Sequence, residues 1–239
     1  MKRRSYRQYC ALAKALDVVG ERWTLLMIRE FMIGPRRYRD LLENLPGMGT
    51  NLLAARLKEL EAQGLIERTV LSEGSRNFAY SLSGRGKALE PVIRGLVQWG
   101  VEILGAPKED DLSRPEWDLV AVRMLFRPEQ AVKVDGFYVL RADELELFIQ
   151  VERGRVNLLD RVPTMAASPI LVEGPGAVLR AIILGEVGID EVMNAGTLQI
   201  KGSRRQAKRF FSCFRNPQND PLPVAEVAPE AAPVVDSVS

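Results

Sequence analysis

The chain has 239 residues, with 33 Lys and Arg, 31 Asp and Glu, two cysteines and no histidine. The lack of histidine excludes Ser-His-Asp and Cys-His catalysis and any histidine-ligated metal, and two cysteines do not make a disulfide framework or a structural zinc site. No apolar run reaches the ~18 residues of a membrane span, and no cofactor-binding loop is present. We therefore expect a cytoplasmic protein of one or two domains that uses no cofactor and is not an enzyme.

The charge is distributed unevenly along the chain. Residues 1–105 hold 17 Lys and Arg against 11 Asp and Glu, whereas residues 106–239 hold 16 against 20. A basic N-terminal part suits a polyanionic partner, although an excess of this size also fits an ordinary solvated surface. The excess becomes informative where it coincides with a nucleic-acid-binding motif.

Three predicted helices fill the first part of the chain. Apolar residues recur at helical spacing over 10–19, and Gly20 is the expected end of that helix. A second apolar helix spans 22–31, and a short third helix, 36–45, follows a Gly-Pro break.

A fourth helix begins after the turn PGMG. Thr50 is predicted as its N-cap, and Gly64 follows its end near Gln63. One face of this helix is apolar and carries Leu53, Leu57 and Leu60. A short helix, a glycine-containing turn and a second helix form the arrangement that lays a helix in the major groove of DNA.

Small and polar residues cover the opposite face of the fourth helix. Small residues allow close approach, asparagine can read an adenine edge, and Arg or Lys can reach guanine or phosphate. Two arginines that start the third helix favour phosphate contacts over a solvated corner, because the helix dipole disfavours cations there. For Arg56, a groove contact and an ion pair with Glu59 or Glu61 are both open. The predicted DNA contacts are Arg36, Arg37, Thr50, Asn51, Ala54, Arg56, Lys58 and Arg76.

Two strand-like runs, 65–70 and 77–83, predict a hairpin that forms a wing. Arg68 and Arg76 would meet the DNA backbone or the minor groove there. The helix 87–104 that follows carries a longer apolar stripe than a small domain needs. We expect this helix and the first one to form the seam of a homodimer.

Several strings in residues 10–104 recur in one known family: LDVVGERWTLLMIRE, GPRRYRDL, LPGMGTNLLAARLKELEAQGLIER and YSLSGRGKAL. This segment resembles the HxlR family of bacterial winged-helix regulators. The resemblance implies a homodimer in which each subunit places its helix in one half of an inverted-repeat operator on double-stranded DNA. The family commonly has proline after the cysteine, whereas this chain has Ala11, so the first helix is free to begin earlier.

Cys10 has two interpretations. Some members of the family that the segment resembles sense oxidants through a cysteine at this position, and a thiol close to several basic residues and to a helix N-terminus suits that chemistry. Free cysteine is more often a small buried hydrophobe, and we favour this second interpretation.

The second half predicts an α+β domain, because its strands precede most of its helices. After an acidic, proline-containing linker at 106–116, a helix (117–126) leads into three strands, a fourth strand near 170–173, and a helix that opens at Gly176. A short helix, a final strand and a helix capped by Ser203 complete it. Residues 216–239, rich in Pro, Ala and Val, predict a disordered tail.

The order of these elements, and above all the segment NAGTLQIKGSRRQAKRFFSCF, resembles the sterol-carrier-protein-like fold over residues 117–215. The resemblance implies an apolar cavity between sheet and helices that takes a fatty or isoprenoid-like effector. The candidate lining residues are Phe137, Val139, Leu147, Ile149, Leu179, Ile183, Val192 and Met193. The alternative for each of them is ordinary core packing.

The first hypothesis is a sequence-specific, homodimeric transcriptional regulator, with repression as the commoner sign. Residues 1–105 would bind DNA and dimerise, and residues 117–215 would bind the effector or support the dimer. The alternative is a carrier of lipids or other apolar small molecules whose helix-turn-helix serves mainly for dimerisation.

Overall fold

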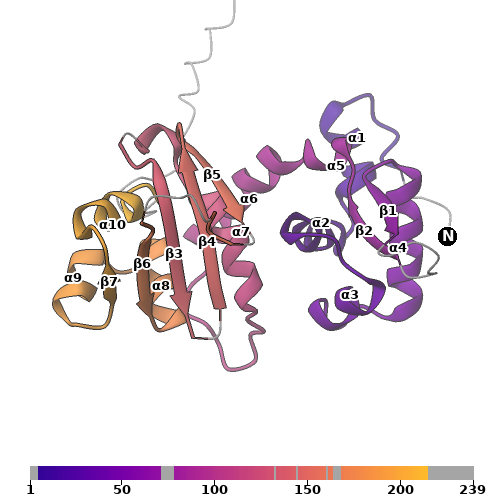
Figure 1. Cartoon of the computed structure of the whole chain (residues 1–239). Helices are drawn as coiled ribbons and strands as arrows, with labels where there is room; N and C mark the ends of the chain where they lie inside the picture. Colours follow the sequence, from indigo (N-terminus) through magenta and orange to yellow (C-terminus); the bar gives the residue numbers. More distant parts are fainter. Residues whose placement is uncertain are drawn as a thin grey trace, which may run out of the picture.

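The computed structural model describes residues 5–70, 78–131, 133–143, 145–159, 161–163 and 168–214. An N-terminal lobe of helices with one hairpin lies beside a C-terminal lobe built on a sheet, and two helices, α6 and α7, lie between them (Figure 1). The predicted α+β class is confirmed. The predicted tail at 216–239 lies outside the described residues. No helix among the residues described is long and apolar enough to span a membrane.

The N-terminal lobe contains the elements that the sequence predicts, with boundaries that differ by a few residues, and one further short helix, α5, that was not predicted separately. They are α1 (Ala11–Val19), α2 (Thr24–Ile33), α3 (Tyr38–Asn44), α4 (Thr50–Ala62), β1 (Ile66–Val70), β2 (Phe78–Leu82) and α5 (Gly84–Lys87). Helix α1 does not begin early: Cys10 is its N-cap, so Ala11 takes the first helical position, where proline is also accepted. Strands β1 and β2 pair antiparallel from Ile66 opposite Leu82 onward, as a wing requires.

The core of this lobe lies between α2, α3, α4 and the hairpin. The predicted stripe Leu53, Leu57 and Leu60 is buried in it, with at most 2% of each residue exposed. Gly86 allows α5 to pack against the end of the hairpin, since a Cβ there would lie 2.1 Å from the carbonyl oxygen of Leu65. Gly86 therefore serves close packing, whereas a Cβ at Gly84 would meet no atom of the described residues within 4 Å.

The C-terminal lobe is one mixed five-stranded sheet with helices packed against it. Its elements are α7 (Pro115–Leu125), a 3₁₀ turn (Pro128–Gln130), β3 (Gly136–Ala142), β4 (Leu145–Glu152), β5 (Arg155–Leu159), β6 (Ile170–Gly174), α8 (Gly176–Leu184), α9 (Ile189–Asn194), β7 (Gln199–Lys201) and α10 (Arg204–Phe211). The strand order is β5-β4-β3-β6-β7, and β3 and β6 are parallel whereas the other neighbours are antiparallel. Strands β3 to β5, the three successive strands that the sequence predicts, form an antiparallel meander, and β6 then crosses to the far side of β3.

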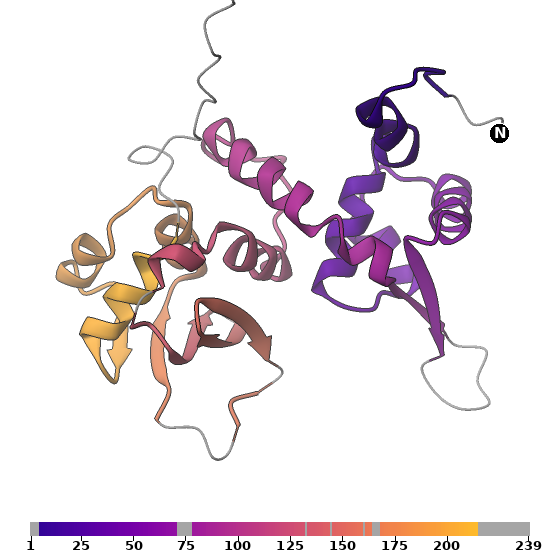
Figure 2. The same ribbon diagram turned by 90° about the horizontal axis from the view of Figure 1, so that it is seen from above.

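The two lobes are joined by helices that pack against both of them (Figure 2). In α7, Val120 and Met124 pack into the N-terminal core, whereas Val122 and Leu125 pack into the C-terminal core. Val97 of α6 (Glu90–Glu102) contacts both cores. Of the predicted linker at 106–116, residues 106–114 lie between α6 and α7, and the last two residues begin α7. The packing of α7 on both sides joins the lobes closely.

Candidate nucleic-acid interface

One face of α4 is free of contacts to the core. Asn51, Ala54 and Lys58 are exposed on it, opposite the buried leucine stripe. Thr50 is exposed as well, but it is the first residue of the helix and not its N-cap. Gly49 takes the N-cap position in an extended conformation. The prediction that Thr50 caps the helix was therefore wrong by one position, because glycine also adopts the cap geometry.

A hydrogen bond and an apolar contact set the position of α4 relative to α3. The hydroxyl of Tyr38 donates to the carbonyl oxygen of Thr50 at 2.7 Å, so the first turn of α3 is tied to the first turn of α4. Leu41 and Leu45 are buried in the core that holds the leucine stripe of α4. The pair of helices thus presents the exposed face of α4 as one rigid unit.

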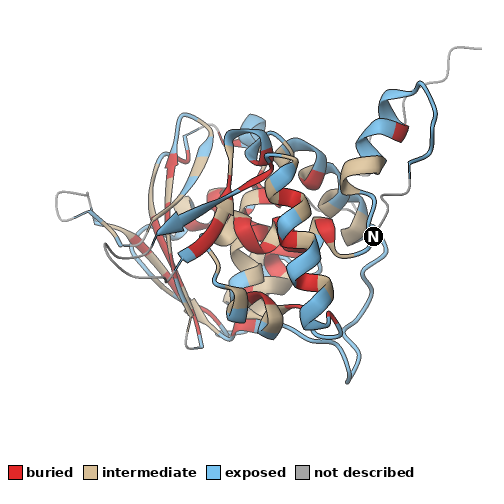
Figure 3. Cartoon of the chain, turned by 90° about the vertical axis from the view of Figure 1, so that its right-hand side faces the viewer, coloured by how far each residue is buried: buried red, intermediate tan, exposed pale blue. Residues whose placement is uncertain are grey.

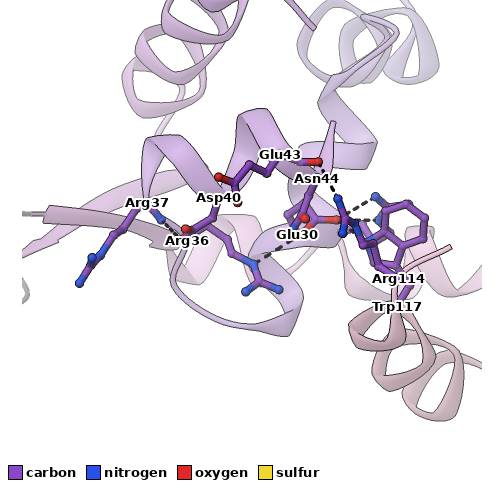
Figure 4. Close-up of polar contacts among 9 residues, drawn as sticks. Glu30, Arg36, Arg37, Asp40, Glu43, Asn44, Arg114 and Trp117 are labelled. Carbon is purple, nitrogen blue, oxygen red and sulfur yellow. Dashed lines mark hydrogen bonds and ion pairs between the residues drawn. The ribbon is translucent and has the colours of Figure 1, made fainter. Parts of the chain in front are cut away.

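The two arginines before α3 point in different directions (Figure 4). Arg37 extends away from the lobe, and its backbone N–H donates to Asp40 Oδ2 at 2.7 Å, which caps the helix. Arg36 turns inward: its Nε lies 3.7 Å from Glu30 Oε2, and its side chain is 18% exposed. Its backbone bridges to Tyr80 of the wing, N–H to carbonyl in both directions. Arg36 therefore joins α2, α3 and the hairpin instead of reaching outward.

Arg56 lies in an ion-pair network. Its guanidinium contacts Glu21 Oε2 at 2.9 Å and Glu59 Oε2 at 2.5 Å, and its side chain is 12% exposed. Of the two open interpretations, the structure shows the ion pair. Glu61 instead pairs with Arg68 on the wing at 3.0 Å. Arg76 lies outside the described residues.

Glu30 is a buried acid that the sequence reasoning missed. It is 0% exposed and accepts hydrogen bonds from Arg29, from Asn44 Nδ2 at 2.9 Å and from Trp117 Nε1 at 2.8 Å. The guanidinium of Arg29 also lies over the Trp117 ring, 3.9 Å from its centroid. The sequence did contain a sign of this site, because Glu30 is a carboxylate within the apolar helix α2 and a buried acid requires hydrogen-bond partners.

Apolar side chains are exposed on α1 and α6. Figure 3 shows α1 projecting from the lobe with most of its residues exposed. The exposed large residues on the two helices are Leu12, Leu16, Val92, Leu96 and Trp99. Cys10, the N-cap of α1, is a free and exposed thiol, so the interpretation as a buried hydrophobe does not hold for the single chain.

The eight residues predicted to line an apolar cavity do not face one space. In the register of β3 and β4, Phe137 and Val139 lie opposite Gln150 and Phe148, on the other face of the sheet from Leu147 and Ile149. Those of the eight that belong to the C-terminal core are Leu147, Ile149, Leu179, Ile183 and Val192. Met193 is half-buried outside this core. The expected alternative, ordinary core packing, describes these five residues.

Comparison with known proteins identifies the N-terminal lobe. Residues 18–108 match the family model HxlR, described as an HxlR-like helix-turn-helix. The chain is 35% identical over 89 residues, 37% of its own length and 82% of the other's, to an uncharacterized HTH-type transcriptional regulator, YvaP, of Bacillus subtilis (strain 168). This chain belongs to the HxlR-like helix-turn-helix family. It is also 36% identical over 88 residues, 37% of its length and 79% of the other's, to the HTH-type transcriptional regulator YodB of the same strain.

A solved structure, the reduced form of YodB from B. subtilis, is 35% identical and is matched over 39% of this chain and 92% of its own, with a TM-score of 0.35. The HxlR match spans α2 to α6 and ends before α7. The interface built from α3, α4 and the wing thus lies within the matched segment. Cys10 and the sheet of the C-terminal lobe lie outside it.

Proposed function

We propose that this chain is a DNA-binding transcriptional regulator of the HxlR type. The observation that carries the proposal is the exposed face of α4, held by α3 and flanked by the β1–β2 wing, in a lobe whose relatives are named HTH-type transcriptional regulators. A helix presented in this way fits the major groove of DNA, which is about 12 Å wide and admits an α-helix.

The proposed contacts follow from exposure. Asn51, with Ala54 on the next turn, meets base edges, because the small alanine allows close approach and the amide can pair with adenine. Lys58 and Arg37 meet phosphates. Thr50 lies beside Asn51 at the leading end of the helix. We omit Arg36 and Arg56 from the set, since both are engaged within the lobe. We retain Arg76, which lies outside the described residues, on its sequence position between β1 and β2.

The proposed active species is a homodimer. The apolar side chains of α1 and α6 listed above are exposed in the single chain, and a second copy would bury them. A twofold dimer places two copies of α4 on two half-sites of an inverted repeat, about one helical turn apart. Because such a complex at a promoter blocks polymerase, we propose repression as its effect.

The test is a selection of random duplex DNA on the purified protein at about 0.15 M salt. Enrichment of an inverted repeat is the expected result. Enrichment of no sequence, with binding that does not weaken as salt rises, would contradict the proposal, since phosphate contacts always release counterions.

A further inference from the structure

A concave, arginine-lined pocket lies where the two lobes meet. It has a volume of about 380 Å³ and is bounded by α6, the end of α7, the turn between β4 and β5, and the start of β5. Four arginines line it, Arg94, Arg123, Arg153 and Arg155, against a single acid, Glu90. Pockets of this size are typical of small-molecule sites.

The two arginines on the helical side are held in place by hydrogen bonds. Arg94 Nη1 donates to the carbonyl oxygens of Met124 and Phe126, at 3.1 and 3.2 Å, where α7 ends. Arg123 donates through Nε and Nη2 to both carboxylate oxygens of Glu90. Glu90 thus compensates one charge of this pair and leaves the helical wall net positive.

The opposite wall is formed by the turn after β4, which carries Arg153, and by Arg155 at the start of β5. Gly154, with a φ of +74°, allows the turn to lie against Pro128, because a Cβ there would be only 3.0 Å from the Pro128 carbonyl oxygen. The N–H of Arg153 donates to Asp135 Oδ1 at 2.9 Å, which fixes the turn further. Across the described ranges, neither Arg153 nor Arg155 forms an ion pair. Two guanidinium groups outside any of these ion pairs therefore face Arg94 and Arg123, which share Glu90. Glu152 lies opposite Arg155 in the strand register.

We propose that this pocket binds a small organic anion with two negative charges, carried by carboxylate or phosphate groups. Guanidinium groups match the planar oxygens of such groups and form strong charge-assisted hydrogen bonds. Phe126 and Val156 give the pocket a limited apolar wall, which suits a short hydrocarbon or aromatic part. This site differs from the apolar cavity that the sequence suggested, because it lies at the junction of the lobes and binds negatively charged molecules.

The position of the pocket couples it to the rest of the molecule. Arg94 and Glu90 belong to α6, the same helix that exposes Leu96 and Trp99. An anion held between α6 and the β4–β5 turn fixes that helix relative to the sheet. If the chain acts as the proposed dimeric regulator, binding of the anion changes the affinity for the operator, because it changes how the α6 helices of the two subunits pack against each other.

The first test measures anion binding alone, by calorimetry and thermal shift with the full chain. Phenyl phosphate is the probe, pyrophosphate tests the charge without a ring, and benzyl alcohol tests the ring without charge. We expect phenyl phosphate to bind and to raise the melting temperature, and benzyl alcohol not to bind. Arg155→Gln should lower the affinity for phenyl phosphate by about tenfold, since one charge-assisted hydrogen bond is lost. The matched control is Arg205→Gln, an exposed arginine on α10.

Three results would overturn the proposal. The first is that phenyl phosphate gives no heat of binding up to about 1 mM. The second is that Arg155→Gln and wild type bind phenyl phosphate with equal affinity. The third is that Arg155→Gln binds DNA more weakly than wild type when no anion is present. The last would make the pocket a phosphate contact for the duplex. None of the calorimetric results depends on DNA, so failure of the anion site and failure of the proposed regulator are separate observations.

Discussion

The indole Nε1 of Trp117 donates a 2.8 Å hydrogen bond to Oε1 of Glu30, a residue 87 positions earlier in the chain. Glu30 is fully buried in α2, and Trp117 belongs to α7. The same carboxylate accepts from Asn44 at the end of α3 and pairs with Arg36 at its start (Figure 4). One buried charge therefore holds α3 and α7, the first helix of the C-terminal lobe, together.

Trp117→Phe tests this junction, since it keeps a ring but removes the N–H. We expect the free energy of unfolding to fall by about 1 to 3 kcal/mol, because a buried carboxylate loses one donor. Urea denaturation measures it. The control is Trp23→Phe: Trp23 is half-buried, and its indole nitrogen has no hydrogen bond within the part of the chain described. An equal loss in both variants would show that the bond to Glu30 contributes nothing specific.

Arg37→Ala should weaken binding to every DNA sequence alike, because Arg37 extends from the lobe toward phosphate rather than toward a base. The slope of log affinity against log salt should fall by about 1. Filter binding or fluorescence anisotropy over a range of salt concentrations measures both. Arg205→Ala, on α10, is the charge-matched control, and a loss of the same size there would indicate a general effect of net charge.

Asn51→Ala should relax specificity at one base pair of each half-site, by about 1 to 3 kcal/mol, because the amide can form a bidentate pair with adenine. Repeating the selection from random DNA with the variant would show one position losing its preference. An unchanged preferred sequence would mean that the leading end of α4 does not read a base.

Leu96→Glu should convert the proposed dimer to monomer. Leu96 is 45% exposed on α6, and a twofold interface would bury two new charges side by side, raising the dissociation constant by about 30-fold or more. Sedimentation equilibrium measures it. Leu112→Glu, which replaces a leucine 42% exposed between α6 and α7, is the control. If both variants sediment like wild type, α6 is not the seam.

The two cysteines should differ in reactivity. Cys10 is exposed, whereas Cys213 is fully buried and its Sγ lies 3.1 Å from the carbonyl oxygen of Arg209. At about pH 8, a disulfide reagent should titrate one thiol rapidly in the native protein and two in urea. Cys10→Ser should remove the rapid phase. A rapid phase that survives in this variant would mean that Cys213 is accessible.

Burial also raises the pKa of Cys213 from 9.0 to about 11. Because the folded chain holds the proton more tightly than the unfolded chain, this contribution to stability is complete below pH 9.0 and is lost as the pH rises through about 11. The difference in unfolding free energy between wild type and Cys213→Ala should therefore shrink over that interval.

The helices and their caps were predictable from the sequence, because they depend on residues within one helical turn of each other. The leucine stripe of α4 depends on spacing alone, and Ser203 caps α10 through its own Oγ, which accepts from the N–H of Gln206 at 3.3 Å. Gly64 adopts the left-handed conformation after α4 for the same local reason. The strings that resemble the HxlR family lie in these local elements, so the family could also be recognised from the sequence.

Only the tertiary structure decided which surfaces meet. Alternation within β3 groups Phe137 with Val139, but the register against β4 decides that Leu147 is on the other face. The same holds for charge: Arg36 and Arg37 are adjacent in sequence, yet the buried Glu30 draws one inward and leaves the other outside. Periodicity and capping act over three or four residues, whereas buried charges and strand register act across dozens, and a sequence pattern does not record which distant partner completes them.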